Sequence, residues 1–345
     1  MFNFFVLQQH GIADVTDWMQ YHAGTFRECS KGVWMPTPRE LAIRLAEIYG
    51  HEIDPHRTYP TGVALSGRLR LAALENEIEP VSTLAAEIAQ PLFAGDEVLP
   101  DQAPCLALAC FSDELAEVKP DSTAAVFLAA QADRFEADPD IRVEDFFFAS
   151  TLLGRAFRAT GNVSFESRLS AFYAAVDTMQ DNGLFWHCHQ APYFWGRGNA
   201  FAALGLAEAL TYVLDDALRS RLATMATTHL AALAGYQHES GFWHQVVDDE
   251  HSYLEHSATT MIGYAIARGI TGGWLPAAQW TPIVERAWEA AASGIGRNGE
   301  IVRVCIGTGP MASIDDYLER PASDGVDARG GGFALWFAVA MMSLP

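Results

Sequence analysis

The sequence predicts an all-α protein in which an inner ring of helices is enclosed by an outer ring. Two sets of alternating helical segments and a scarcity of strand patterns support this fold class. The inner set shares one design: a Gly-, Pro- or polar-rich loop opens into a helix that is apolar on nearly all sides, as expected for enclosed helices. Its members lie near residues 59–74, 103–117, 143–160, 198–213, 257–270 and 330–342.

Between these segments lie helices with one charged face, which we expect to form the outer ring. They cover residues 38–50, 82–93, 122–135, 164–180, 216–235 and 280–294. Repetition of this kind is typical of helical arrays, either closed or stacked as an open solenoid. Six helices of each kind favour the closed form, an (α/α)6 barrel. Residues 242–247 and 301–307 alternate briefly and are expected to form short β-hairpins in loops.

Composition limits the partners that the protein can have. The 345 residues carry a net charge of −21, which disfavours nucleic acids and anionic membranes. No apolar run reaches membrane-spanning length. The opening MFNFFVLQQHG lacks the basic segment and cleavage site of a signal peptide. No low-complexity linker divides the chain, so we expect a single domain, residues 1–345, acting on a small molecule as a monomer or homodimer.

Cysteine usage favours a reducing, cytoplasmic compartment. The cysteines are odd in number and scattered without a CxxC pair, which argues against disulfides and a thiolate metal site; they are Cys29, Cys105, Cys110, Cys188 and Cys305. The tripeptide His187-Cys188-His189 suggests a metal site only weakly, because adjacent loop residues rarely converge on one ion. We therefore predict neither a metal nor a cofactor.

Loops before the inner helices hold the residues with useful chemistry. If the inner helices run in one direction, these loops meet on one face. GLFWHCHQAPYFWGRGN (183–199) and GFWHQVVDDEHSYLEHSA (241–258) echo each other, and 304–332 forms a third long loop. Aromatic rings stack on sugars, while His, Arg and Asn donate hydrogen bonds to hydroxyls and carboxylates. The pattern indicates a carbohydrate site at the mouth of the ring.

Asp145 is the carboxylate that this pattern favours most. It opens an inner helix and precedes Phe146, Phe147 and Phe148. An apolar setting raises the pKa of a carboxyl group and prepares it to donate a proton near neutral pH. A helix-capping role is the simpler alternative. Asp101 precedes the second inner helix, with the same ambiguity.

Two histidines and an arginine are candidates for binding substrate. His187 and His244 occupy matching positions in the echoing loops, each directly after Trp. Arg197 lies between glycines that allow a ligand to approach the backbone closely. A structural ion pair is its alternative role.

Several motifs together resemble glycoside hydrolase family 105 and the related family 88. These are the unsaturated rhamnogalacturonyl and unsaturated glucuronyl hydrolases. The matching motifs run through most of the chain and are YPTGVALSGRLRL (59–71), EDFFFASTLLGRAFRATGN (144–162), GLFWH (183–187), FWGRGNAFAALGLAEAL (194–210), 241–270 and the segment 304–335. The resemblance implies an (α/α)6 barrel without a cofactor. It also implies removal of a 4,5-unsaturated uronic acid by hydration of its double bond.

The resemblance also implies roles for individual residues. Asp145 corresponds to the family's acid/base, and Asp101 is a candidate for its second active-site Asp. Substrate-binding roles are implied for His187, Trp195, Arg197, Asn199 and His244. The chain departs from the family at Ala200 and Phe201 and at residues 188–190, which puts the aglycone in question.

Two other functions remain open at this stage. A sugar isomerase or epimerase on a similar barrel would use His187 and His244 as acid and base. A non-catalytic oligosaccharide-binding relative would keep the aromatic residues, and Asp145 would then be expendable.

Overall fold

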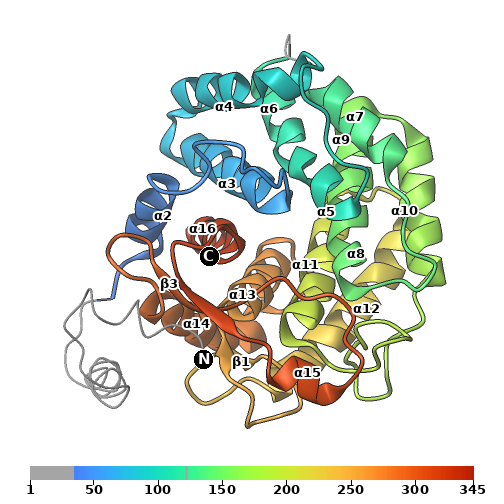
Figure 1. Cartoon of the computed structure of the whole chain (residues 1–345), viewed down its shortest axis with the longest axis vertical. Coiled ribbons are helices and arrows are strands. Elements are labelled where there is room, and N and C mark those ends of the chain that lie inside the picture. Colours follow the sequence, from blue (N-terminus) through green and yellow to red (C-terminus); the bar gives the residue numbers. More distant parts are fainter. Residues whose placement is uncertain (1–34, 121–122) are drawn as a thin grey trace, which may run out of the picture. The chain divides into compact units, whose positions relative to one another are not determined.

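Two concentric rings of helices make up the unit Thr37–Pro345 of this computed structural model, which describes residues 35–120 and 123–345 (Figure 1). The inner ring is formed by α3 (Tyr59–Glu75), the run α5–η3–α6 (Ala103–Leu106, Ala107–Phe111, Ser112–Val118), the run α8–η4–α9 (Val143–Ala149, Ser150–Gly154, Arg155–Thr160), α11 (Gly196–Tyr212), α13 (His256–Thr271) and α16 (Ala328–Met341). Inner neighbours pack in chain order, and α16 returns to α3 to close the ring.

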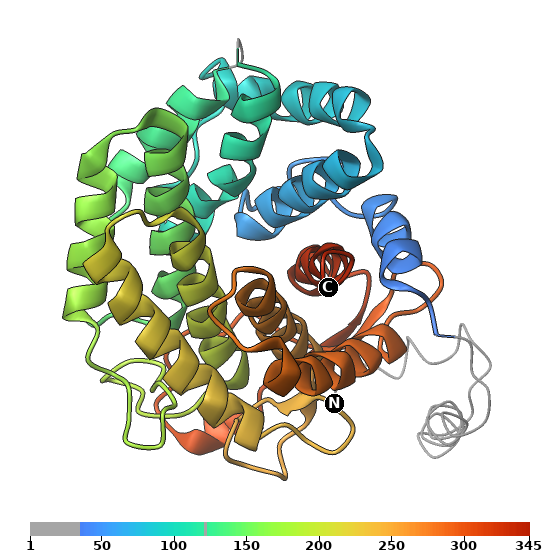
Figure 2. The ribbon, with the colours of Figure 1, turned by 180° about the vertical axis from the view of Figure 1, so that it is seen from behind.

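The outer ring alternates with the inner one along the chain. It consists of α2 (Pro38–Ala46), α4 (Ile78–Phe93), α7 (Ala124–Arg134), α10 (Val163–Ala175), α12 (Asp216–Gly235) and α14 (Ala277–Ser293). The same closed order is visible from the opposite side (Figure 2). The predicted fold class, with its six inner and six outer segments, is thereby confirmed for the residues that the structure describes.

Small residues let the inner helices approach closely. A Cβ atom at Gly205 of α11 would lie 2.3 Å from the backbone carbon of Phe146 in α8. At Gly62 of α3 it would lie 2.1 Å from the carbonyl oxygen of Leu108 in η3. Only glycine fits where two backbones come this close. This explains why the inner segments are rich in small residues.

Aromatic side chains fill the interior of the ring beneath its mouth. The ring centroids of Tyr59 and Phe147 are 6.0 Å apart, and those of Phe147 and Trp336 are 6.1 Å apart. Phe201 and Phe333 belong to the same cluster. These contacts fill the interior of the ring with a packed aromatic core.

Two antiparallel hairpins lie in the loops at the mouth, as predicted. Strand β1 (Trp243–His244) pairs with β2 (Leu254–Glu255), and β3 (Ile301–Cys305) pairs with β4 (Ala322–Gly325). The short helix α15 (Ile314–Leu318) lies between β3 and β4 in sequence. Within the described residues, no helix is both long enough and apolar enough to cross a membrane.

Candidate active site

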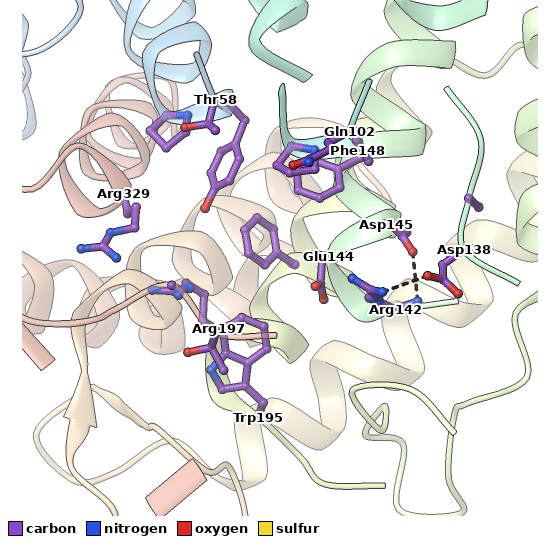
Figure 3. Close-up of a pocket in the computed structure, with 18 of the residues that line it drawn as sticks. Thr58, Gln102, Asp138, Arg142, Glu144, Asp145, Phe148, Trp195, Arg197 and Arg329 are labelled. Carbon is purple, nitrogen blue, oxygen red and sulfur yellow. Dashed lines mark hydrogen bonds and ion pairs between the residues drawn. The ribbon is translucent and has the colours of Figure 1, made fainter. Parts of the chain in front are cut away.

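A cavity of about 670 Å³ opens where the N-terminal ends of inner helices meet (Figure 3). Its wall comes from the starts of α3, α5, α8, α11 and α16 and from the loops beside them. The charged residues in it are Glu136, Asp138, Arg142, Glu144, Asp145, Arg197 and Arg329. The loops before the inner helices therefore converge on one face, as the sequence analysis expected.

Asp145 lies in this cavity and is only 5% exposed. It is the third residue of α8, and its Oδ2 accepts a hydrogen bond of 3.1 Å from the backbone N–H of Arg142. Its Oδ1 makes no hydrogen bond with any described residue. Burial, followed by the neighbouring charge of Glu144, raises the pKa of Asp145 to about 7. Asp145 thus caps its helix with one oxygen, and its other oxygen has no partner among the described residues.

Glu144 also lines the cavity, and its side chain is 14% exposed. Its Oε2 lies 3.1 Å from Nε2 of His187. In Figure 3 it lies between the Arg197 side of the cavity and the Asp145 side. The cavity therefore contains two adjacent carboxylates that come from one helix.

His187 is fully buried behind Glu144 and does not line the cavity. Its Nδ1 is 2.5 Å from the hydroxyl of Tyr317 in α15, and its ring is 4.9 Å from that of Trp195. The resemblance implied that His187 contacts the substrate, but its buried position leaves no room for direct contact. His187 reaches the site through Glu144.

Arg197 and Trp195 form the opposite side of the cavity. The guanidinium of Arg197 lies 5.1 Å from the Trp195 ring centre, and its Nη2 donates a 2.7 Å hydrogen bond to the carbonyl of Ile306. Its Nη1 donates to the carbonyl of Cys305. Arg197 is 2% exposed, yet no carboxylate of the described residues lies within 4.0 Å of it. A buried cation with spare donors and no anionic partner suits a ligand carboxylate.

Arg329 extends this basic side. It stands at the opening of α16 and lines the cavity, with an ion pair of 2.5 Å to Asp327. Figure 3 shows Arg197 and Arg329 on one side of the cavity, away from Asp145 and Arg142. The site therefore has two arginines at one side and the carboxyl group of Asp145 at the other.

Besides His187, three predicted site residues do not line this cavity. Asp101 has a side chain that is 79% exposed and forms an ion pair of 3.4 Å with Arg134; its neighbour Gln102 lines the cavity instead. Asn199 is fully buried and exchanges hydrogen bonds with the backbone of Phe185, which fixes the loop before α11. These two residues support or flank the site.

His244 is the third of these residues and lines a separate cavity of about 550 Å³. Its Nδ1 lies 2.6 Å from the carbonyl oxygen of Ser252. His187 lines neither this cavity nor the one that contains Asp145.

Sequence reasoning missed several residues of the site. Tyr59 and Arg329 stand at the openings of the first and last inner helices. Asp145 was selected because it opens an inner helix, and the same criterion would have selected these two residues. Glu144 was passed over in favour of its neighbour. Tyr317 gave no local signal, because it meets His187 across 130 positions of sequence.

The profile of Glycosyl Hydrolase Family 88 matches residues 147–344, which is more than half of the chain. The chain belongs to this family, and the resemblance to families 88 and 105 is confirmed. The matched range includes His187, Trp195, Arg197, Asn199 and His244 but begins just after Asp145.

One curated relative is the unsaturated rhamnogalacturonyl hydrolase YesR of Bacillus subtilis. It is 31% identical over 191 residues, which are 50% of this chain and 51% of the relative. The chain thus spans about half the length of this relative.

Solved structures share the fold. A possible member of family GH105 from Salmonella enterica superimposes with a TM-score of 0.78 at 18% identity, covering 90% of this chain and 95% of that one. The unsaturated glucuronyl hydrolase of Bacillus sp. GL1 gives a TM-score of 0.63 at 14% identity, covering 86% and 93%. At these identities the likeness establishes the (α/α)6 barrel alone.

Proposed function

We propose that the protein is a glycosidase that removes a 4,5-unsaturated uronic acid from the non-reducing end of oligosaccharides released by polysaccharide lyases. The observation that carries this proposal is the pairing, in one cavity, of a buried carboxyl with a pKa of about 7 and a buried arginine without a carboxylate partner. A uronate supplies the missing anion. The activity in the name of YesR supports the same reaction.

The cavity suggests how the substrate lies. Arg197, with Arg329 beside it, would hold the uronate carboxylate at C5. Asp145 would then face the double bond from the other side of the cavity and donate its proton to C4. Positive charge develops at C5, where the ring oxygen stabilises it. Water adds at C5, the resulting hemiketal opens, and the aglycone leaves from C1.

This reaction needs only a modest acid. Ordinary glycosidases place two carboxyl groups on either side of the scissile bond. Protonation of an enol ether carbon instead requires one proton donor whose pKa is close to the working pH. The pKa of Asp145 meets this requirement.

The alternative of a sugar isomerase using His187 and His244 as acid and base has less support, because His187 is fully buried and His244 lines a different cavity from Asp145. A non-catalytic relative would expose Asp145 and leave its pKa near the ordinary value, which is the reverse of what burial does here.

A direct assay tests the proposal. Unsaturated uronides absorb in the ultraviolet, and hydration removes this absorption. We expect the protein to bleach at least one substrate in a panel of lyase-generated pectin, ulvan and glycosaminoglycan oligosaccharides. Unchanged absorbance with every member of the panel would overturn the hydrolase assignment.

The panel also identifies which uronide and which aglycone the enzyme accepts. We further propose that the enzyme works in the cytoplasm, where its four described cysteines, all buried and free, would stay reduced.

A further inference from the structure

We propose that Glu144 is a second acid–base residue of the site, which takes the proton of the attacking water, and that His187 and Tyr317 position its carboxylate. This inference rests on the proposed function and adds a residue to it. The sequence had suggested Asp101 as the second carboxylate, but that side chain is largely exposed and paired with Arg134. Glu144 lines the cavity beside Asp145.

The environment of the Glu144 carboxylate is unusual. Its Oε2 is buried and makes no hydrogen bond with any described residue. His187 Nε2 lies 3.1 Å away, close enough for electrostatic attraction but not aligned for a hydrogen bond. A buried carboxylate oxygen without a donor has lost its water and has gained no replacement. Because Oε2 is enclosed against His187, the other oxygen, Oε1, is the one that can accept a hydrogen bond from a water molecule in the cavity.

The contacts of His187 determine which of its two ring nitrogens carries the proton. The backbone N–H of Met311 donates to the Tyr317 hydroxyl at 3.2 Å, so the hydroxyl proton is free to be donated onward. The acceptor within reach is His187 Nδ1, at 2.5 Å. A neutral imidazole that accepts at Nδ1 carries its proton on Nε2, the atom nearest Glu144. The histidine thus presents a positive edge to the carboxylate.

Trp195 keeps this arrangement in place. The His187 ring lies 4.9 Å from the Trp195 ring at an interplanar angle of 33°, so the imidazole cannot rotate freely. The histidine is fully buried, which protects its tautomer from solvent. Glu144 therefore meets a fixed dipole, not a mobile side chain.

Two carboxyl groups divide the proton transfers of the hydration. Asp145 gives its proton to C4, and the electrons of the C4–C5 double bond form the new C–H bond. The water oxygen bonds to C5, and the proton it releases goes to Glu144. Glu144 then returns a proton to Asp145 through solvent, so that one water molecule is consumed and both groups regain their starting states.

The charges facing this pair come from several elements. Arg142 and Asp138 lie just before α8, Glu136 lies in the same loop, and Arg197 and Arg329 face it across the cavity. The Arg142–Asp138 pair is closed at 2.8 Å, and Arg329 is paired with Asp327. Arg197, reserved for the substrate, is the unpaired cation on that side.

Four variants test the proposal with one bleaching assay. Glu144→Gln keeps the shape and removes the base, and we expect kcat to fall about 100-fold with KM nearly unchanged. Tyr317→Phe removes only the hydroxyl that faces His187, and we expect kcat to fall about tenfold. Asp145→Asn provides the reference loss for the proton donor.

Tyr193→Phe is the matched control. Its hydroxyl donates to the carbonyl of Ala312 at 3.3 Å, and its ring lies 5.4 Å from that of Tyr317. The hydroxyl therefore anchors the same loop without a hydrogen bond to the His187 ring, and the Tyr193 carbonyl that accepts from the His187 N–H at 3.0 Å is unchanged in the variant, so we expect less than a twofold change. An equal loss of kcat in Tyr317→Phe and Tyr193→Phe would show that Tyr317 only anchors the loop. Activity of Glu144→Gln within threefold of the wild type would overturn the proposal while leaving the proposed function intact.

A spectroscopic measurement tests this proposal independently of the activity assay. In ¹⁵N NMR spectra of the whole protein, His187 should carry its proton on Nε2, and Glu144→Gln should shift that resonance. This result is expected whether or not any substrate in the panel is bleached. A proton on Nδ1, or no response to Glu144→Gln, would overturn the positioning role.

Discussion

The two ends of helix α11 hold their buried charges in opposite ways. At its start, Arg197 lies in the cavity with no carboxylate of the described residues within 4.0 Å. Eleven positions later, Glu208 is fully buried, with its Oε2 2.7 Å from Arg155 Nη2 and its Oε1 accepting a 2.7 Å hydrogen bond from Tyr264. Both groups belong to one inner helix, about 16 Å apart along its axis.

A network of ion pairs surrounds Glu208. Arg155 also donates to Asp113 at 2.7 Å and to Glu114 at 3.1 Å, while Arg70 binds Glu114 at 2.6 Å. A buried ion pair of this kind holds helices in register, and breaking it leaves an uncompensated charge. From this comparison we propose that, inside this ring, a charge with partners serves the fold and a charge without them serves the ligand. The predictions below test this division.

The largest effect is expected at the cavity. Asp145→Asn should lower kcat by about 10³- to 10⁴-fold, because an amide cannot give a proton to C4. The amide oxygen can still accept from the Arg142 N–H, so thermal unfolding should stay close to that of the wild type. Loss of activity together with loss of the folded state would mean that Asp145 is chiefly a helix cap.

The paired network should show the reverse behaviour. Arg155→Met should lower the free energy of unfolding by about 3–5 kcal/mol, since Asp113 stays buried without its cation and Glu208 keeps only the more distant Arg70, at 3.8 Å. Activity per folded molecule should change little. Arg197→Met is the matched control: it removes a buried arginine that has no carboxylate partner, and its cost in a urea titration should be below about 2 kcal/mol. Equal costs at the two positions would contradict the comparison.

A milder change at Arg197 sharpens the assignment of its role. Arg197→Lys keeps the charge but loses the planar fork, so KM should rise about tenfold, which is about 1.4 kcal/mol of binding, with a smaller change in kcat. Steady-state kinetics on the best substrate of the panel measures both constants. An unchanged KM would make Arg197 a structural residue.

The smallest effect is expected in the pH dependence of stability, where Asp145 and Glu208 contribute with opposite signs. Asp145 has a folded pKa of about 7, above its ordinary value of 3.8, so the stability it contributes is lost as the pH rises toward and past 7. Arg155 and Arg70 hold the pKa of Glu208 at about 2, below its ordinary value of 4.5, so its contribution is lost as the pH falls from about 4.5 toward 2.

Melting temperatures across pH should separate the two contributions. The difference between Asp145→Asn and wild type should grow in favour of the variant between pH 5 and 8, by on the order of 1 kcal/mol. The difference between Glu208→Gln and wild type should shrink below pH 4. Parallel curves for all three proteins would show that neither carboxyl group is perturbed as described.

The ring itself could be predicted because its signal is local. Apolar inner segments alternate with one-sided outer segments, and each predicted range overlaps the observed helix or helical run, as at 198–213 for α11 and 216–235 for α12. Helix starts were predictable too, which led to Asp145 and Arg197. Burial on all sides requires a different composition from burial on one side, and this difference is visible without a structure.

The arrangement within the site could not be predicted in the same way. Whether Asp145 or Glu144 faces a given wall depends on the rotation of α8 about its axis, which sequence spacing alone does not determine. His187 was expected against the substrate, but Tyr317 reaches it from a distant loop and the pair is buried. Repetition placed His187 and His244 in equivalent loops, yet the loops differ in how they fold over the mouth.

Closure of the ring has a consequence for the order of events during synthesis. Helix α16 packs against α3, and it also brings Arg329 to the cavity. These contacts join the first inner helix to the last across a large sequence separation, so they form only after α16 has been synthesised. A nascent chain lacking α16 would have an open cleft with an incomplete anion-binding wall. We therefore expect uronide binding only after the ring has closed, which makes binding a measure of the last step of folding.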